Sequence, residues 1–322
     1  MLNAQQVIDA IHGSYQTGSK NGHRNVLALL AHMGVEMKTP YVHVAGTNGK
    51  GSTCAMLSSV LKAAGYKVGL YTSPFLQQYQ ERIRLNGVPL TDEQMVKYGN
   101  PLVEAAGKMA TQGDFVTPFE MGTALAFAAF DGEECDMAII EVGMGGRLDP
   151  TNVIHPVACA ITAIGLDHMG FLGNTLEEIA GEKAGIIKQD VPVVCYPAQE
   201  SVRAVFAQKA AEMHAPLVQL EEGFITAASG DMYGSTVSYQ LGEIWQDDPS
   251  QAELIQALIG SLGFTESGLP YPLSAKYHLC LEGIESALIA RNRPGDRITD
   301  YGKHCVEQMK QLCDHVMAQK KG

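Results

Sequence analysis

The sequence predicts an α/β fold in which a mostly parallel sheet has helices on both faces, followed by a helical tail. Short apolar runs alternate with helical patterns from residue 40 to residue 220. Strands that alternate with helices favour parallel crossover connections, so this order predicts a mostly parallel sheet. A glycine-rich turn joins the first apolar run to a helix, an arrangement that favours anion binding at the helix N-terminus.

Composition places the chain among ordinary globular proteins. Its 322 residues are 46% hydrophobic and 18% charged, which allows one large or two ordinary domains with a full core. The net charge of −12 argues against a non-specific binder of nucleic acid or of acidic membranes. Seven scattered cysteines without a CxxC pair indicate reduced thiols and predict a cytoplasmic protein. We find no signal-peptide pattern and no apolar run of membrane-spanning length, and we expect a monomer.

The individual elements follow from apolar periodicity and from capping residues. Val7, Ile8 and Ile11 share one face of the first helix, and Thr91 and Thr175 stand at the N-cap positions of two later helices. The predicted helices are residues 1–12, 25–33, 54–64, 91–113, an alanine-rich segment up to residue 130, 175–184 and 201–213. The predicted strands are residues 42–45, 67–73, 136–142, 158–165, 192–196 and 216–220.

The strongest functional signal is the stretch at residues 46–53, Gly-Thr-Asn-Gly-Lys-Gly-Ser-Thr, which follows the first strand. Its glycines let backbone N–H groups approach an anion, and the dipole of the following helix favours negative charge there. Lys50 adds a full positive charge, and Ser52 or Thr53 can offer a hydroxyl to Mg²⁺. The general P-loop pattern is not met, because Gly51 separates Lys50 from Ser52. A glycine-rich turn that only caps a helix is the alternative.

A second signal is Glu141 at the carboxyl end of the strand predicted at residues 136–142. Ligands of open α/β sheets bind at this edge. A carboxylate in that place can hold Mg²⁺ on the phosphates of a nucleotide. A solvated acidic residue at a strand end is the alternative interpretation.

Residues 45–53, A-G-T-N-G-K-G-S-T, resemble the ATP loop of folylpolyglutamate synthase and dihydrofolate synthase, in the Mur ligase superfamily. The Gly-Ser pair after the lysine favours this folate branch over the peptidoglycan Mur ligases. Three other stretches are similar to the same family. They are E-R-I-R-L-N-G at residues 81–87, G-M-G-G-R-L-D-P-T-N at residues 143–152 and L-E-E-I-A-G-E-K-A-G-I-I-K at residues 176–188.

The resemblance implies an ATP- and Mg²⁺-dependent amide-bond ligase. Such an enzyme adds L-glutamate to the carboxylate of a folate or dihydropteroate through an acyl-phosphate. It also implies that Lys183 is carbamylated by CO₂. The residues implied for ATP binding are Gly46, Thr47, Asn48, Gly49, Lys50, Gly51, Ser52 and Thr53. Those implied for magnesium are Ser52, Ser73, Glu141 and His168, those for catalysis Lys50, His168 and Lys183, and those for folate contact Arg82 and Phe119.

Some of these residues also have ordinary structural interpretations. On spacing alone, Lys183 would be a surface lysine paired with a glutamate of its own helix. Arg82 would lie on a solvated strand face, and Phe119 in a helix packed on the sheet. Phe75 stands where the family has histidine, and His23 stands where it has leucine.

The resemblance covers residues 8–225. Beyond Tyr239 the sequence contains neither the family's G-x-H-Q-x-x-N-A segment nor the D-G-A-H-N-P motif of its C-terminal domain. Periodicity predicts three helical stretches there instead, at residues 250–262, 274–290 and 300–319.

The domain prediction follows from this boundary. Residues 1–240 are expected to form a Mur-ligase-like ATP-binding domain, and residues 241–322 a helical tail in place of the family's C-terminal glutamate-ligase domain. The leading hypothesis is an active folate-type ligase. The alternative is a truncated, non-catalytic ATP-binding remnant of that family, and a weaker third is a Mur-type ligase with a different carboxylate substrate.

Overall fold

The computed structural model describes the chain except for residues 15–21, 197, 221–224, 231–234 and 240–322. The chain divides into two compact units, and the larger one contains an eight-stranded sheet with helices α1 to α8. Strands β9 (Ile225–Gly230) and β10 (Ser235–Tyr239) pair in a separate two-stranded sheet. The helical stretches expected between residues 241 and 322 lie outside the described residues.

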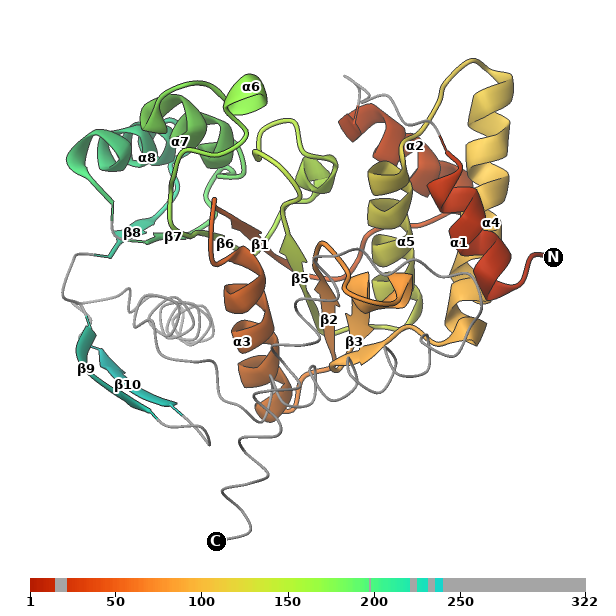
Figure 1. Cartoon of the computed structure of the whole chain (residues 1–322), viewed down its shortest axis with the longest axis horizontal. Helices are drawn as coiled ribbons and strands as arrows, with labels where there is room; N and C mark the ends of the chain where they lie inside the picture. The colour runs from red at the N-terminus through yellow and green to blue at the C-terminus, as the bar shows by residue number, and fades with distance from the viewer. Residues whose placement is uncertain (15–21, 197, 221–224, 231–234, 240–322) are drawn as a thin grey trace, which may run out of the picture. The chain divides into compact units, whose positions relative to one another are not determined.

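The large sheet has the strand order β4-β3-β2-β5-β1-β6-β7-β8 (Figure 1). In this order, every neighbouring pair between β2 and β8 is parallel. At the other edge, β3 pairs antiparallel with both β2 and β4. The predicted α/β fold with a mostly parallel sheet is therefore confirmed. The strands are β1 Tyr41–Ala45, β2 Val68–Tyr71, β3 Ile83–Leu85, β4 Val88–Pro89, β5 Met137–Glu141, β6 Ala158–Ile161, β7 Val193–Cys195 and β8 Leu217–Gln219.

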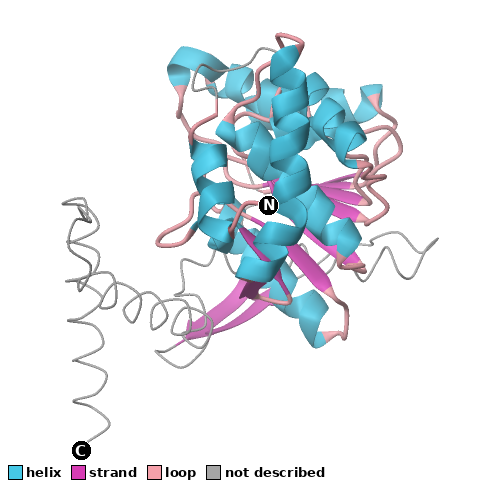
Figure 2. Cartoon of the chain, turned by 90° about the vertical axis from the view of Figure 1, so that its right-hand side faces the viewer, coloured by secondary structure: helices cyan, strands magenta, loops and turns pink. Residues whose placement is uncertain are grey.

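Helices cover both faces of this sheet (Figure 2). Alternate side chains of a strand point to opposite faces, and β5 shows both: Ile140 packs with α1, α2, α4 and α5, whereas Ile139 packs with α3. Helices α7 and α8 pack on Cys159 and Ile161 of β6. The helices are α1 Ala4–His12, α2 Gly22–Met33, α3 Lys50–Ala63, α4 Asp92–Thr111, α5 Pro118–Gly132, α6 Met169–Leu172, α7 Leu176–Ala184 and α8 Glu200–Glu212.

The predicted helix starts are confirmed by their hydrogen bonds. Thr91 and Gln94 form a reciprocal capping box at the start of α4, and Thr175 and Glu178 form another at the start of α7. The Glu178 side chain therefore caps the first turn of its own helix. Helix α2 begins at Gly22, three residues earlier than expected, and the short helix α6 was not expected.

The antiparallel edge of the sheet was also not expected. Strands β3 and β4 are joined by Asn86 and Gly87, whose φ angles are 50° and 85°. Two consecutive residues with positive φ form the tight turn that matches the twist of a β-hairpin. The Asn-Gly pair was the sequence signal for this hairpin, and it was available in the E-R-I-R-L-N-G stretch.

Candidate functional site

The glycine-rich loop lies at the carboxyl end of β1 and leads directly into α3. All five residues of β1 are buried, so the strand fixes the start of the loop. Gly46 has φ 148° and Gly49, the N-cap of α3, has φ 84°, values that side chains with a Cβ rarely adopt. The first amides of a helix lack partners within it, so this end of α3 presents N–H groups and a positive dipole end.

The loop is held from one side by the segment that follows β6. Thr47 donates its N–H to the Ala163 carbonyl at 2.8 Å, and its hydroxyl makes 3.1 Å hydrogen bonds with both the N–H and the carbonyl of Gly165. Thr162 donates its hydroxyl to the Asn48 carbonyl at 2.7 Å. The N–H of Thr47 therefore has a partner within the protein, and these hydrogen bonds hold the loop against the segment after β6.

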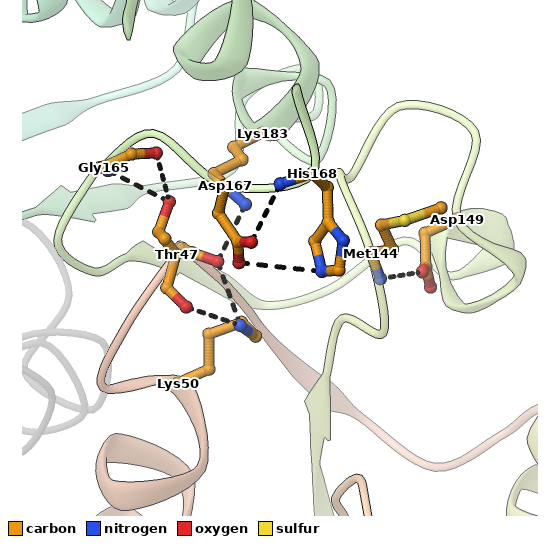
Figure 3. Close-up of polar contacts among 9 residues, drawn as sticks. Thr47, Lys50, Met144, Asp149, Gly165, Asp167, His168 and Lys183 are labelled. Atoms are coloured by element: carbon orange, nitrogen blue, oxygen red, sulfur yellow. Dashed lines mark hydrogen bonds and ion pairs between the residues drawn. The ribbon is translucent and has the colours of Figure 1, made fainter. Parts of the chain in front are cut away.

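Two lysines meet at one backbone oxygen of this loop. Lys183 of α7 donates to the Gly46 carbonyl at 2.8 Å, and Lys50 donates to the same carbonyl at 3.1 Å and to the Thr47 carbonyl at 3.0 Å (Figure 3). Lys183 is only 4% exposed. The surface position that spacing alone gave Lys183 is therefore wrong, because the tertiary fold turns α7 toward the loop.

The shared carbonyl has an electrostatic consequence. Burial, and secondly the neighbouring charge of Lys50, lower the pKa of Lys183 from 10.5 to about 8. Asp167 and Asp149 act in the opposite direction. Near neutral pH Lys183 therefore has a substantial population of the neutral, nucleophilic amine.

Glu141 lies on the other side of the loop, at the end of β5. It is 4% exposed, and one carboxylate oxygen accepts the Ser73 N–H at 2.8 Å. The other oxygen lies 3.4 Å from the point where a Cβ on Gly51 would stand. Burial raises the pKa of Glu141, while the Ser73 N–H and the charge of Lys50 act against that rise. The structure thus brings Glu141, Ser73 and Gly51 together.

His168 lies beyond β6, at the N-cap of α6. It has a left-handed backbone, with φ 50°, and its ring stands 3.6 Å from the Asp167 carboxylate (Figure 3). About half of each of these two side chains is exposed. Asp167 is not among the site residues predicted from the sequence, but it lies beside Lys183 in Figure 3, and its charge acts to raise the Lys183 pKa.

The two residues expected at a folate contact lie beside aromatic rings. Arg82 stacks over Phe75, with 5.1 Å from its guanidinium carbon to the ring centre, and over Tyr79 at 5.8 Å. Its buried Nε has no hydrogen-bond partner. Phe119 packs against Tyr71, and a Cβ on Gly143 would stand 2.4 Å from its ring. Phe119 therefore borders the loop that follows Glu141.

The lowered pKa of Lys183 gives a testable prediction. With a pKa of about 8, about a quarter of Lys183 is neutral near pH 7.5, against about a thousandth of an ordinary lysine. Trace labelling with acetic anhydride across pH, read by mass spectrometry against free Nα-acetyl-lysine amide, should give a midpoint near 8. A midpoint at about 10 or above would contradict the buried contact with Gly46.

The same shift predicts how stability depends on pH. The folded-state pKa lies below the unfolded value of 10.5, so between about 8 and 10.5 the unfolded chain binds more protons. The contribution of Lys183 to the free energy of unfolding therefore rises with pH across that window.

The described part of the chain contains no helix that is long and apolar enough to cross a membrane. Its four cysteines, at positions 54, 135, 159 and 195, are all buried free thiols.

Comparison with known proteins identifies the family. Residues 44–240 match the Mur ligase middle domain. The chain is 44% identical over 220 residues to the dihydrofolate synthase/folylpolyglutamate synthase of Bacillus subtilis, covering 67% of this chain and 51% of that protein. It is 38% identical over 244 residues to the folylpolyglutamate synthase of Lacticaseibacillus casei, covering 74% and 57%. It thus spans about half the length of these curated relatives.

A solved structure agrees with these relatives. It is an FPGS–AMPPCP–folate complex with a TM-score of 0.72 and 34% identity, covering 85% of this chain and 70% of that one. The glycine-rich loop and Glu141 both lie within residues 44–240, which the family model matches. The chain therefore belongs to the Mur ligase family, in the branch of folylpolyglutamate synthase and dihydrofolate synthase.

Proposed function

We propose that the protein is an ATP-dependent ligase that joins L-glutamate to the carboxylate of a folate or a dihydropteroate. The observation that carries the proposal is the meeting of Lys50 and Lys183 at the Gly46 carbonyl, with Glu141 beside Gly51. The relatives named as folylpolyglutamate or dihydrofolate synthases, and the solved complex with AMPPCP and folate, support it.

The proposed reaction transfers one phosphoryl group and then forms an amide. A substrate carboxylate oxygen attacks the γ-phosphorus of ATP, and the bond to ADP breaks. The glutamate amine then attacks the acyl carbon, phosphate leaves with the carboxylate oxygen, and the amine loses a proton. Both steps depend on positioning and on neutralising charge. Residues 46–53 would bind the ATP phosphates through the N-terminus of α3, and Lys50 would exchange its two loop carbonyls for phosphate oxygens.

The residues proposed to hold Mg²⁺ are Ser52, Ser73, Glu141 and His168. Mg²⁺ usually takes one or two carboxylates and completes its shell with water and phosphate oxygens. The described residues fit this habit, because Glu141 presents a buried carboxylate beside the glycine-rich loop and Ser73 lies next to it, its N–H hydrogen-bonded to that carboxylate. Imidazole is an uncommon Mg²⁺ ligand, so His168 rests on the resemblance alone. When bound, Mg²⁺ would neutralise phosphate charge.

Lys183 is proposed to react with CO₂. Its neutral amine attacks the carbon of CO₂, a nitrogen–carbon bond forms and one proton is released, which leaves a carbamate anion. The lowered pKa of Lys183, about 8, supports this step because only the neutral amine is a nucleophile. The change from cation to anion would also end its repulsion of Lys50.

Arg82 and Phe119 are proposed to contact the folate-type substrate. Phe119 borders the loop after Glu141, and an aromatic ring there can stack on a flat heterocycle. The unpaired Nε of Arg82 is available to a carboxylate. We also propose that the protein is cytoplasmic, which the buried free thiols of the described cysteines support, and that it is a monomer.

The ligation assay tests this proposal. Purified protein is incubated with ATP, Mg²⁺, bicarbonate, L-glutamate and either dihydropteroate or tetrahydrofolate, and products are identified by mass spectrometry. We expect a product heavier by one glutamate residue with at least one acceptor, and ADP in equal amount. Absence of any extended product with either acceptor would overturn the proposal.

A second candidate function is nucleotide binding without ligation. It needs only the glycine-rich loop and Lys50, which is hydrogen-bonded to the Gly46 and Thr47 carbonyls at 3.1 and 3.0 Å. This candidate predicts tight binding of ATP in the assay above without any glutamate-extended product.

A further inference from the structure

A buried chain of polar side chains connects the strand beneath the glycine-rich loop to the loop after Glu141. His43, in the middle of β1, is fully buried, and its Nε2 lies 2.9 Å from the Thr151 hydroxyl. The Thr151 hydroxyl lies 2.5 Å from the Asp149 carboxylate. Thr151 is fully buried and Asp149 is 4% exposed, so water does not compete for these contacts.

The protons in this chain can be assigned by counting. The Asp149 carboxylate also accepts the N–H groups of Thr151 and Met144, both at 2.9 Å. Burial raises the pKa of Asp149, but these hydrogen bonds favour the ionised form, so we assign Asp149 as the acceptor and the Thr151 hydroxyl as the donor. That hydroxyl has a single proton, so it must accept from His43, which therefore carries its proton on Nε2. The other ring nitrogen, Nδ1, is buried without a partner. His43 is a neutral donor, in agreement with a pKa that burial, and secondly Lys188 and His23, lower to about 3.

Asp149 connects this series of buried polar side chains to the candidate site. Its carboxylate holds the Met144 N–H, three residues beyond Glu141, and its own backbone carbonyl bonds to His23 of α2 at 2.9 Å. Gly143, next to Met144, lies against the Phe119 ring. The segment at residues 143–149 is therefore fixed between the candidate metal-binding carboxylate and the candidate folate contact.

The same loop is tied to the helix that carries Lys183. Arg147 donates its N–H to the Glu182 carbonyl at 2.8 Å, and the Asn152 side chain donates to the carbonyls of Arg147, at 3.2 Å, and Gly185, at 3.0 Å. The loop after Glu141 is thus hydrogen-bonded to the C-terminal end of α7.

We propose that His43 is a positioning residue, which orients Asp149 through Thr151 and so fixes residues 143–149 for the folate-type substrate. The role of this positioning in catalysis rests on the proposed function. The mechanical part, which is the ordering of residues 143–149 by His43, does not. His43 lies within β1, so the strand that precedes the glycine-rich loop also supports the loop after β5. It does so through the hydrogen bond between His43 and Thr151, and His43 itself does not contact the substrate.

Hydrogen exchange in the full-length chain tests the mechanical part. His43→Leu removes the donor, and His43→Gln retains a side-chain N–H that can reach Thr151. We expect amide exchange at residues 143–149 to become about tenfold faster in His43→Leu, to return toward the native rate in His43→Gln, and to stay within about twofold at residues 46–53. Val42→Ala, on the same strand with its side chain on the opposite face, should leave residues 143–149 unchanged.

A second pair of variants covers the case in which His43→Leu fails to fold. Thr151→Val removes the hydroxyl at nearly constant shape, and Thr151→Ser retains it, so only the first should speed exchange at residues 143–149. Native exchange rates in both His43→Leu and Thr151→Val, or an equal rise in Val42→Ala, would overturn the proposal. These readouts require no turnover, so they are independent of the ligase assay.

If the chain ligates, the same variants separate binding from chemistry. Thr151→Val should raise the KM for the folate-type substrate about tenfold while the KM for ATP changes less than about twofold, because the loop before α3 retains its contacts with the segment after β6. An equal effect on both KM values would indicate general destabilisation and contradict the positioning role.

Discussion

Replacing Lys50 with methionine should weaken binding of the ATP analogue AMPPCP, with Mg²⁺, by about 100-fold or more. Lys50 is anchored on the carbonyls of Gly46 and Thr47, 3.1 and 3.0 Å away, so its charge already stands at the loop that would hold the phosphates. Charged hydrogen bonds to phosphate contribute about 1.5–3 kcal/mol each, and loss of one or two gives this change in affinity. Titration calorimetry measures it, and the ligation rate should fall by about 1000-fold.

The Lys50→Met variant also tests the effect of Lys50 on Lys183, which shares the Gly46 carbonyl with it. The charge of Lys50 lowers the pKa of Lys183, so its removal should move the labelling midpoint of Lys183 above 8. Lys62→Met, near the other end of α3, is the matched control and should change neither quantity. Unaltered nucleotide affinity in Lys50→Met would contradict the assignment of residues 46–53 as the nucleotide site.

Replacing Gly46 with alanine should destabilise the protein by about 2–5 kcal/mol. A Cβ at Gly46 would stand 1.7 Å from the Thr162 hydroxyl oxygen, and φ at this position is 148°. Thr162 cannot turn away without cost, because its hydroxyl is hydrogen-bonded to the carbonyls of Asn48, at 2.7 Å, and Ala45, at 3.2 Å. Urea unfolding of the full-length chain measures the loss.

Gly165→Ala is the control for that experiment. It lies in the same cluster of loops, but its nearest atom to an added Cβ would be the Thr47 methyl carbon at 3.7 Å, an ordinary contact. We expect a change of less than about 1 kcal/mol. Similar losses in Gly46→Ala and Gly165→Ala would show that close packing at Gly46 is not what requires glycine there.

Much of the fold could be predicted from local signals. Buried parallel strands are continuous apolar runs and their helices have capping residues, so alternation and caps located β1, β5 and α7 within a few residues. The glycine-rich loop was recognisable as a candidate site because a glycine-rich turn and a lysine have few other reasons to stand between a strand and a helix. The β3–β4 hairpin was not predicted, although Asn86-Gly87 carried its signal.

The contacts that carry the site could not be predicted in this way. Lys183 reaches Gly46 across 137 residues of sequence, and only the packing of α7 on β6 brings them together. His43 stands in an apolar strand, where nothing local indicates that it faces Thr151 rather than a ligand. Such contacts depend on register between distant elements, which neither periodicity nor spacing encodes.

The most direct test of the account is the fate of the substrate's carboxylate oxygen. A folate-type acceptor labelled with ¹⁸O in the reacting carboxylate is incubated with the protein, ATP, Mg²⁺, bicarbonate and L-glutamate. Activation as an acyl-phosphate predicts that each inorganic phosphate released carries one ¹⁸O atom, in an amount equal to the glutamate-extended product. Unlabelled phosphate, released with or without product, would contradict phosphoryl transfer to the substrate at this site.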